Sequence, residues 1–578
     1  MPLESSSNQS LSAHTRPLSR YLVRRFSRAA SGLPPRTKAI LALALLLLTW
    51  RCAGPSTGLI GVTTALRSDT LAVRTRLVKF PPTTFPERGA RLCFANGAVQ
   101  EVFPSSAVRD EYEPLWERSE VVAVELPFGG RLRWFGDNGE EGTLERGKGD
   151  DCRAGACRGI ERVKYEQDAV LGLRQMRLSD PSDEITFSIP PSQPFFSPSA
   201  VTLTTQFTVS RLSRFERMLH AWNGPLSTSI YFTDPSDISA LEDHLSSPHL
   251  SSAWEKVALT FVKPDYSISE SALLKRLRYP INMLRNLAIR AAPTSYILVI
   301  DVDFVPSPRT HDLLSTRGVP LLHLPSTRNS PSPTLLRTAL VIPTFALSPS
   351  FNASNTPFPS SLSALSSLFH ASPPLATLTD PNAGHGPTLP SLLFSPPPSL
   401  LLAHSPLSSV SPAWTYSVCY EPQWEPYYLL HRSSHPFYDE RFTDQGGDKQ
   451  SHAALLNAMG YEFRVVRDAW VVHPPKRDRK EEEWPAARLV RQGGKPDGSH
   501  SDVEREKEEE EEEEGGGEEE HFNLEAQRDE SRFRYFQDFM PEMERAFGRN
   551  WRWPRGCSAR EAGGRAFGRA RVEGVFGL

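Results

Sequence analysis

The sequence predicts an α/β domain of the doubly wound type, in which strands of a mostly parallel sheet alternate with helices. Two observations support this prediction. From residue 201 onward, short β-branched runs alternate with segments whose apolar residues recur at helical spacing. Residues 296–300 then form a run with no polar face, which is typical of a central strand buried on both sides.

The elements follow one another in a regular order through the first half of this domain. Residues 201–209 are rich in Val and Thr, as strands are, and residues 211–222 place apolar side chains at helical spacing before Gly224 and Pro225 end the helix. Two further strands are predicted at 226–232 and 257–262, and two further helices at 236–245 and 279–290. The strand at 296–300 completes the series.

Two carboxylates, Asp301 and Asp303, follow that apolar strand directly. Because side chains alternate along an extended chain, both lie on the same side at the carboxyl end of the strand, where open α/β sheets bind ligands. Hard oxygen donors of this kind suit Mg²⁺ or Mn²⁺, and a metal held there can clamp a substrate diphosphate. The alternative is a pair of solvated acids in the turn after the strand.

The helix before that strand carries polar residues beside its apolar stripe. Asn282, Arg285 and Asn286 lie off the stripe of the helix at 279–290. We predict that they, together with Asp301, contact a nucleotide or its diphosphate. An ordinary polar helix face is the alternative.

The second half of the domain is interrupted by sequence rich in Pro, Ser and Leu, within which one strand is predicted at 338–343. A strand at 414–420 follows the interruption. Beside it, Trp424 and Glu425 are candidates to hold a sugar face and its hydroxyls, although aromatic clusters are more often part of the core.

Two further candidates lie near the end of the domain. Asp448 precedes a helix predicted at 453–459, and His473 closes an apolar strand predicted at 463–473. A lone histidine at a strand end usually takes no part in chemistry, so the residues alone leave its role open.

Composition divides the rest of the chain. A basic tail precedes an apolar run interrupted by Arg51, which predicts a signal anchor, with a cleaved secretory signal or an organellar transit peptide as alternatives. The net charge is −3, and no basic patch with interleaved aromatics suggests nucleic acid. The predicted organisation is a cytosolic tail at 1–38, the anchor at 39–62, a stem or small β-rich module at 63–200, the α/β domain at 201–475 with a low-complexity insert at about 345–412, a disordered acidic insert at 476–520, a docking helix at 521–553 and a tail at 554–578.

Several ordered segments together resemble the LARGE-type and β-1,4-glucuronyltransferase group of glycosyltransferases, family 49. They lie at 201–232, 279–286, 300–306, 339–343, 384–388, 425–427, 438–442 and 461–463, with His473 after them. The resemblance implies a Golgi membrane enzyme of type II topology with a lumenal catalytic domain of the GT-A fold. It also implies manganese, a UDP-sugar donor, a glycan or glycoprotein acceptor, and a β-linked product made with inversion.

The resemblance further implies a set of metal ligands. Asp301, Asp303 and His473 match the positions at which the family holds its metal, here Mn²⁺ or Mg²⁺. A metal bridging the diphosphate neutralises the charge that accumulates on the UDP leaving group.

A carboxylate base is needed to take the proton from the acceptor hydroxyl as it attacks the anomeric carbon. Asp448 is the first candidate, because inverting enzymes of this fold often hold the base just before a late helix. Relatives tend to have Asn at this position, so Asp448 departs from the family pattern, and Asp444 or Glu425 are alternatives. The departure leaves the donor open, with glucuronic acid and xylose as the first candidates.

Two other functions also fit the residues. A haloacid-dehalogenase-like phosphatase has an apolar strand before Asp-x-Asp, and Asp301 would then be its nucleophile and Asp303 its acid/base. That class places the motif near the start of its domain, whereas half an α/β domain precedes it here. A catalytically inactive, sugar-binding relative is the other alternative.

Overall fold

We analysed a computed structural model of the full chain. It describes residues 69–81, 90–94, 99–102, 121–136, 140–146, 160–193, 196–248, 250, 252–322, 337–351, 358–379, 385–395, 414–422, 424–444, 446–475 and 530–552. The chain divides into residues 1–74 and residues 75–578, and the elements named below lie in the second unit.

Four predicted segments lie outside the described residues: the basic tail, the signal anchor, the acidic insert at 476–520 and the tail at 554–578. Among the helices that are described, none has the length and apolar character needed to cross a bilayer.

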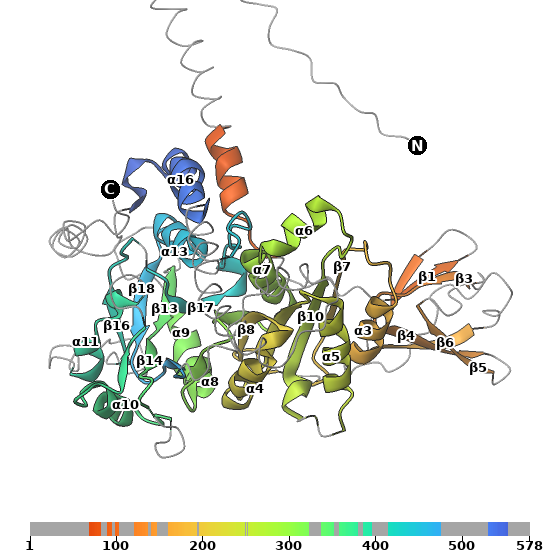
Figure 1. The fold of residues 1–578 in the computed structure, drawn as a ribbon, viewed down its shortest axis with the longest axis horizontal. Helices are drawn as coiled ribbons and strands as arrows, with labels where there is room; N and C mark the ends of the chain where they lie inside the picture. The colour runs from red at the N-terminus through yellow and green to blue at the C-terminus, as the bar shows by residue number, and fades with distance from the viewer. Residues whose placement is uncertain are drawn as a thin grey trace, which may run out of the picture. The chain divides into compact units, whose positions relative to one another are not determined.

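A nine-stranded mixed sheet organises the second unit (Figure 1), in the order β16-β18-β13-β17-β11-β8-β9-β10-β7. Its strands are β7 (Ile185–Ile189), β8 (Val201–Thr208), β9 (Leu226–Tyr231), β10 (Val257–Lys263), β11 (Tyr296–Val299), β13 (Thr338–Ile342), β16 (Thr415–Val418), β17 (Tyr427–His431) and β18 (Glu462–Val466). Every residue of β8, β9, β10, β11 and β13 is buried, as runs without a polar face require. The predicted α/β class is confirmed.

Strands β8, β9, β10 and β11 are parallel neighbours in the order β10-β9-β8-β11. The chain therefore builds outward from β8 in one direction and then returns to its other side, so that the strand order reverses between β8 and β11. The connecting helices are α4 (Leu212–Ala221), α5 (Pro235–Leu245), α6 (Glu270–Leu277) and α7 (Ile281–Ala291). Helix α7 packs on β8, β9 and β10 (Figure 1).

The predicted strand at 463–473 is two strands in two sheets. Strand β18 ends at Val466, and β19 (Val471–His473) joins a four-stranded sheet in the order β12-β19-β14-β15. The other members are β12 (Val305–Pro306), β14 (Thr344–Leu347) and β15 (Ala376–Leu378). The bend at 467–470 between them begins with the charged residues Arg467 and Asp468, which the prediction of one continuous strand overlooked.

The Pro/Ser/Leu-rich region holds more structure than the predicted loop insertion. Its described helices are α8 (Thr310–Leu313), α9 (Val319–Leu322), α10 (Leu362–Phe369) and α11 (Pro390–Phe394). Short helices of this kind have little periodicity, but local signals mark two of them: Ser361 caps α10 with its hydroxyl, and Pro390 begins α11. Their aromatic residues pack on β14, with the rings of Phe345 and Phe394 at 5.9 Å.

The region before residue 200 contains two small antiparallel sheets, β2-β1-β3 and β5-β4-β6. Their strands are β1 (Ala90–Phe94), β2 (Val99–Val102), β3 (Val121–Glu125), β4 (Gly130–Gly136), β5 (Glu141–Glu145) and β6 (Ile160–Gln167). Helix α3 (Ala169–Arg177) and β7 follow. Strand β7 extends the nine-stranded sheet, so the main sheet begins before the predicted start at residue 201.

The last helices cover the end of the domain. Helix α13 (Asp448–Ala458) begins five residues before its predicted start, because Gly447 enters it with a φ of +74°. The predicted docking helix is described from residue 530 and includes a π turn at Tyr535–Phe539 followed by α16 (Met540–Phe547). Both α16 and the short helix η10 (Arg549–Arg552) pack on α13.

Candidate active site

The candidate site lies where the strand order of the main sheet reverses. Strands β8 and β11 are parallel neighbours, with Val299 opposite Thr204, and the backbone N–H of Ile300 donates to the Thr204 carbonyl at 3.0 Å. Asp301 and Asp303 come directly after this point. Strand β8 continues four residues further, to Thr208. Crevices at such reversals, outside the carboxyl ends of parallel strands, are where α/β sheets bind ligands.

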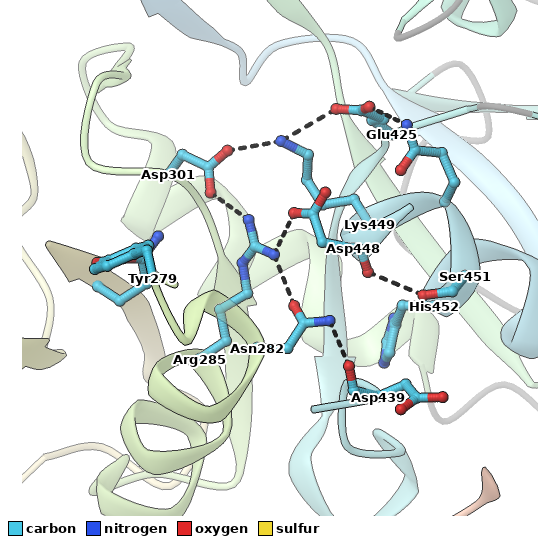
Figure 2. Close-up of polar contacts among 12 residues, drawn as sticks. Tyr279, Asn282, Arg285, Asp301, Glu425, Asp439, Asp448, Lys449, Ser451 and His452 are labelled. Atoms are coloured by element: carbon cyan, nitrogen blue, oxygen red, sulfur yellow. Dashed lines mark hydrogen bonds and ion pairs between the residues drawn. The ribbon is translucent and has the colours of Figure 1, made fainter. Parts of the chain in front are cut away.

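Asp301 is held by three side chains, of which Figure 2 shows Arg285 and Lys449. Its Oδ1 accepts from the guanidinium of Arg285 at 2.8 Å, and its Oδ2 accepts from the Tyr427 hydroxyl at 2.7 Å and the Lys449 ammonium at 2.8 Å. Burial opposes ionisation, but the charges of Lys449 and Arg285 outweigh it and hold the pKa of Asp301 well below its usual range. This carboxyl is therefore ionised.

Alternating charges extend from Asp301 on both sides, as Figure 2 shows. Arg285 also donates to Asp448 Oδ2 at 2.6 Å, and Lys449 also reaches Glu425 Oε2 at 3.1 Å. Burial raises the pKa of Glu425, which the charge of Lys449 partly offsets. The network joins α7, the loop after β11, the segment before β17 and the first turn of α13.

Asp303 has different partners from Asp301. Its Oδ2 accepts from Arg211 at 2.9 Å and its Oδ1 from Arg214 at 2.7 Å. Arg211 ends the short helix η2 (Val209–Arg211) that follows β8, and Arg214 lies in the first turn of α4. Asp303 therefore ties the end of β8 to the end of β11.

The three predicted polar residues of α7 are buried and contact protein groups. Asn282 accepts from Arg285 and donates to the Asp439 carbonyl at 2.8 Å. Asn286 exchanges two hydrogen bonds with the backbone of Tyr438, both at 2.9 Å. These amides fix the loop before α13 against α7. The predicted contact of Asn282, Arg285 and Asn286 with a nucleotide stays a prediction.

His473 lies beside the Asp-x-Asp turn. In the pairing of β12 with β19, Val305 is opposite Val472, and the ring of His473 lies 5.3 Å from that of Phe304, edge to face. Phe304 directly follows Asp303. The four-stranded sheet thus brings His473 from late in the sequence to the neighbourhood of the carboxylates.

No group of three or more His, Cys, Asp or Glu side chains is already gathered for a metal ion within the described part of the chain. The donor types of the predicted set, two carboxylates and one imidazole, suit Mn²⁺ or Mg²⁺. Each carboxylate oxygen has two lone pairs, so an oxygen that accepts from an arginine can still bind a metal. The metal set Asp301, Asp303 and His473 stays a prediction.

The remaining predicted residues differ in their surroundings. Trp424 is fully buried and packs edge to face on Phe463 at 5.0 Å, whereas Glu425 faces Lys449. Burial raises the pKa of Asp444 to about 6, while a hydrogen bond of 2.7 Å from the Tyr279 backbone N–H opposes the increase.

Four residues of the site have no assigned role in the sequence analysis: Tyr427, Lys449, Arg211 and Arg214. Tyr427 and Lys449 lie next to predicted candidates in the sequence, but no local pattern shows that both reach Asp301. The two arginines occupy the expected polar positions of a helix start. Only the reversal of strand order, which brings residue 211 next to residue 303, could have drawn attention to them.

Comparison with known proteins shows which protein family this chain is similar to. Residues 245–372 and 403–493 match the model of the family Glyco_transf_49, described as "Glycosyl-transferase for dystroglycan". These segments include Asp301, Asp303, Asp448 and His473. Over these two segments the chain is therefore similar to a family of glycosyltransferases.

Individual relatives are similar to this chain over about half of its length. Xylosyl- and glucuronyltransferase LARGE2 of Mus musculus is 32% identical over 313 residues, which cover 54% of this chain and 39% of the relative. Glycosyltransferase-like protein gnt14 of Dictyostelium discoideum is 29% identical over 304 residues, covering 50% and 40%. The predicted resemblance to the LARGE-type glycosyltransferases is thus confirmed.

These matches have a limited extent. The chain spans about two fifths of the length of the curated relatives it matches, 39% and 40% for the two named. The crystal structure of GalNAc-T7 with UDP, GalNAc and Mn²⁺ aligns at 8% identity and a TM-score of 0.27 over 50% of this chain and 46% of that one, which adds nothing to the assignment.

Proposed function

We propose that this chain is an inverting, metal-dependent glycosyltransferase of the GT-A fold, which transfers a sugar from a UDP-sugar to a glycan acceptor. The observation that supports this most is the position of the Asp-x-Asp turn at the reversal of strand order, within a segment that matches a glycosyltransferase family. The names of the LARGE relatives favour xylose or glucuronic acid as the transferred sugar.

Asp301, Asp303 and His473 would hold the metal ion. When bound, Mn²⁺ or Mg²⁺ would stabilise negative charge on the diphosphate as the sugar leaves. Arg285, Tyr427 and Lys449 fix Asp301 in its ionised form, because three hydrogen bonds to its oxygens leave little freedom for the carboxylate to turn. That rigidity suits a ligand that must keep its orientation during the reaction.

The base that accepts the acceptor proton is proposed to be Asp448. It lies in the first turn of α13, and the Arg285 guanidinium joins it to Asp301. Glu425 and Asp444 are the alternatives, and burial favours them in one respect. A base works best when its pKa is near the working pH, and burial raises the pKa of both carboxyls.

The proposed compartment is the Golgi lumen, reached through the predicted signal anchor. Cys419 is disulfide-bonded, which agrees with an oxidising compartment. The enzyme would then act on glycoproteins that pass through the same lumen.

An assay of UDP release tests the proposal. The full chain is incubated with Mn²⁺ and a panel of UDP-sugars, and we expect metal-dependent UDP release that Asp303→Ala abolishes. Asp312→Ala is the matched control, since Asp312 is a half-exposed acid in the nearby α8. Phosphate release from phosphomonoesters through an aspartyl intermediate would instead support a phosphatase, and sugar binding without turnover an inactive relative.

A second series identifies the base. Asp448→Asn, Glu425→Gln and Asp444→Asn are compared in turnover under saturating donor. Loss of the true base is expected to lower kcat by about 10²- to 10⁴-fold. If Asp448→Asn retains full kcat, the assignment of Asp448 is wrong.

A further inference from the structure

Arg211 occupies an exposed position at the reversal of strand order. It lies three residues beyond the end of β8, next to the turn after β11. Its side chain is 30% exposed, whereas that of Arg285 on the other side of the Asp-x-Asp turn is 1% exposed. Arg211 is therefore open to a ligand that enters the crevice, and Arg285 is not.

Arg211 also has donors to spare. Within the described residues, Asp303 is its only hydrogen-bond partner, through one nitrogen, and none of its nitrogens is buried without a partner. A guanidinium carries five N–H groups in a planar fork. By contrast, the two terminal nitrogens of Arg285 already donate hydrogen bonds to Asp301, Asp448 and Asn282.

Asp303 orients Arg211 but accepts a hydrogen bond from only one of its nitrogens. The second oxygen of Asp303 accepts from Arg214 at 2.7 Å, so the carboxylate is held from both sides and cannot swing away. An arginine that is positioned by an acid and keeps free N–H groups is suited to two oxygens of a phosphate, because the fork matches their spacing.

We propose that Arg211 binds the diphosphate of the nucleotide donor. The inference rests on the proposed function and adds a contact that lies outside the segments matched to the glycosyltransferase family. In this arrangement Asp303 has two roles: it holds Arg211 in place, and it offers its remaining lone pairs to the metal. The diphosphate would thus lie between Arg211 and the metal position.

The test measures nucleotide affinity rather than turnover. Full-length wild type, Arg211→Gln and Arg211→Lys are titrated with UDP and with uridine by calorimetry, once with Mn²⁺ and once with EDTA. Arg217→Gln is the matched control, because Arg217 is an exposed arginine of α4, the helix that begins directly after Arg211. Thermal unfolding of each variant reports whether the fold is intact.

We expect Arg211→Gln to weaken UDP binding by about 10- to 100-fold, the size of one or two lost charge-assisted hydrogen bonds, with or without Mn²⁺. Uridine binding should not change, Arg211→Lys should fall between, and Arg217→Gln should equal wild type. UDP affinity that is unchanged in Arg211→Gln, or an equal loss for uridine, overturns the inference and leaves the proposed function standing. A wild type that binds no UDP overturns both.

Discussion

Asp301 and Asp303 are two residues apart and equally exposed, at 20% and 19%, yet their surroundings differ. Asp301 contacts a buried arginine, a buried tyrosine and a lysine, which belong to three separate elements. Asp303 contacts two arginines from the single segment that follows β8. The first carboxylate is held by side chains of three elements, including the fully buried Arg285, and the second by two partly exposed arginines of one segment.

The partners of the two carboxylates therefore differ in how much they contribute to the stability of the fold. Removing a buried charged partner leaves another charge without compensation, so the Asp301 side cannot change without cost to the fold. A partly exposed ion pair contributes little to stability, because water replaces the lost partner. The partners of Asp303 can therefore take part in ligand binding at little cost to the fold.

The largest expected effect comes from Arg285→Met. This change leaves Asp301 and the buried Asp448 without the buried cation that they share, and it should lower the free energy of unfolding by about 3–5 kcal/mol. Arg211→Met removes an arginine from Asp303 at an exposed position and should cost at most about 1 kcal/mol. Urea unfolding at pH 7 measures both, and equal losses would remove the distinction between the two sides.

The next effect concerns the tyrosine on Asp301. Tyr427→Phe deletes one hydroxyl and keeps the ring that packs on Phe304 at 5.3 Å, so only the hydrogen bond to the carboxylate is lost. A hydrogen bond to a charged group contributes about 1.5–3 kcal/mol, and the same decrease in unfolding free energy is expected. Tyr296→Phe, in the same sheet, is the control for loss of a hydroxyl elsewhere.

A decrease no larger than that of the control would mean that Lys449 and Arg285 alone hold Asp301. The buried side would then depend on charge and not on the full set of contacts.

Much of the fold could be predicted from sequence, because the strands of the first half are buried on both sides and have no polar face. The prediction failed where two strands follow each other closely in the sequence and were predicted as one. Residues 463–473 divide between two sheets at a bend that begins with the charged pair Arg467-Asp468, which the prediction of one continuous strand overlooked. Short helices such as α10 and α11 were missed because one or two turns show no period.

The site was predictable in its carboxylates and not in its cations. The Asp-x-Asp turn can be recognised in the sequence because it directly follows an apolar strand, which is a local pattern. Lys449 and Arg211 reach it from segments about 150 residues later and 90 residues earlier, a convergence that only the strand order produces. Arg285 was identified, but its burial between two acids was not, because periodicity does not tell a polar face from a buried network.

A histidine beside the Asp301 network predicts how the domain responds to acid. Burial, with the nearby charge of Lys449, lowers the pKa of His385 to about 3, well under the value of about 6.5 in an unfolded chain. Between these values the unfolded chain binds a proton that the folded chain does not. Stability should therefore fall as the pH decreases below about 6.5, by up to about 2 kcal/mol at pH 5 from this residue.

The substitution His385→Asn removes this acid-dependent loss of stability. The free energy of unfolding of the variant minus that of wild type should be about 2 kcal/mol higher at pH 5.0 than at pH 7.5, because only wild type is destabilised by acid through this residue. His370→Asn, at an exposed position after α10, is the control and should show no such change. If His385→Asn follows wild type at both pH values, the histidine is not buried in its neutral form.

The smallest effect separates the two carboxylates by salt. The Debye length falls from about 10 Å at 0.1 M to about 3 Å at 1 M, and exposed pairs are screened far more than buried ones. The stability difference between wild type and Arg211→Met, at most about 1 kcal/mol at low salt, should disappear in 1 M KCl, whereas that of Arg285→Met should persist. A difference for Arg285→Met that also disappears would place water around the Arg285–Asp301 pair, and the contrast between the buried arginine at Asp301 and the partly exposed arginine at Asp303 would then be wrong.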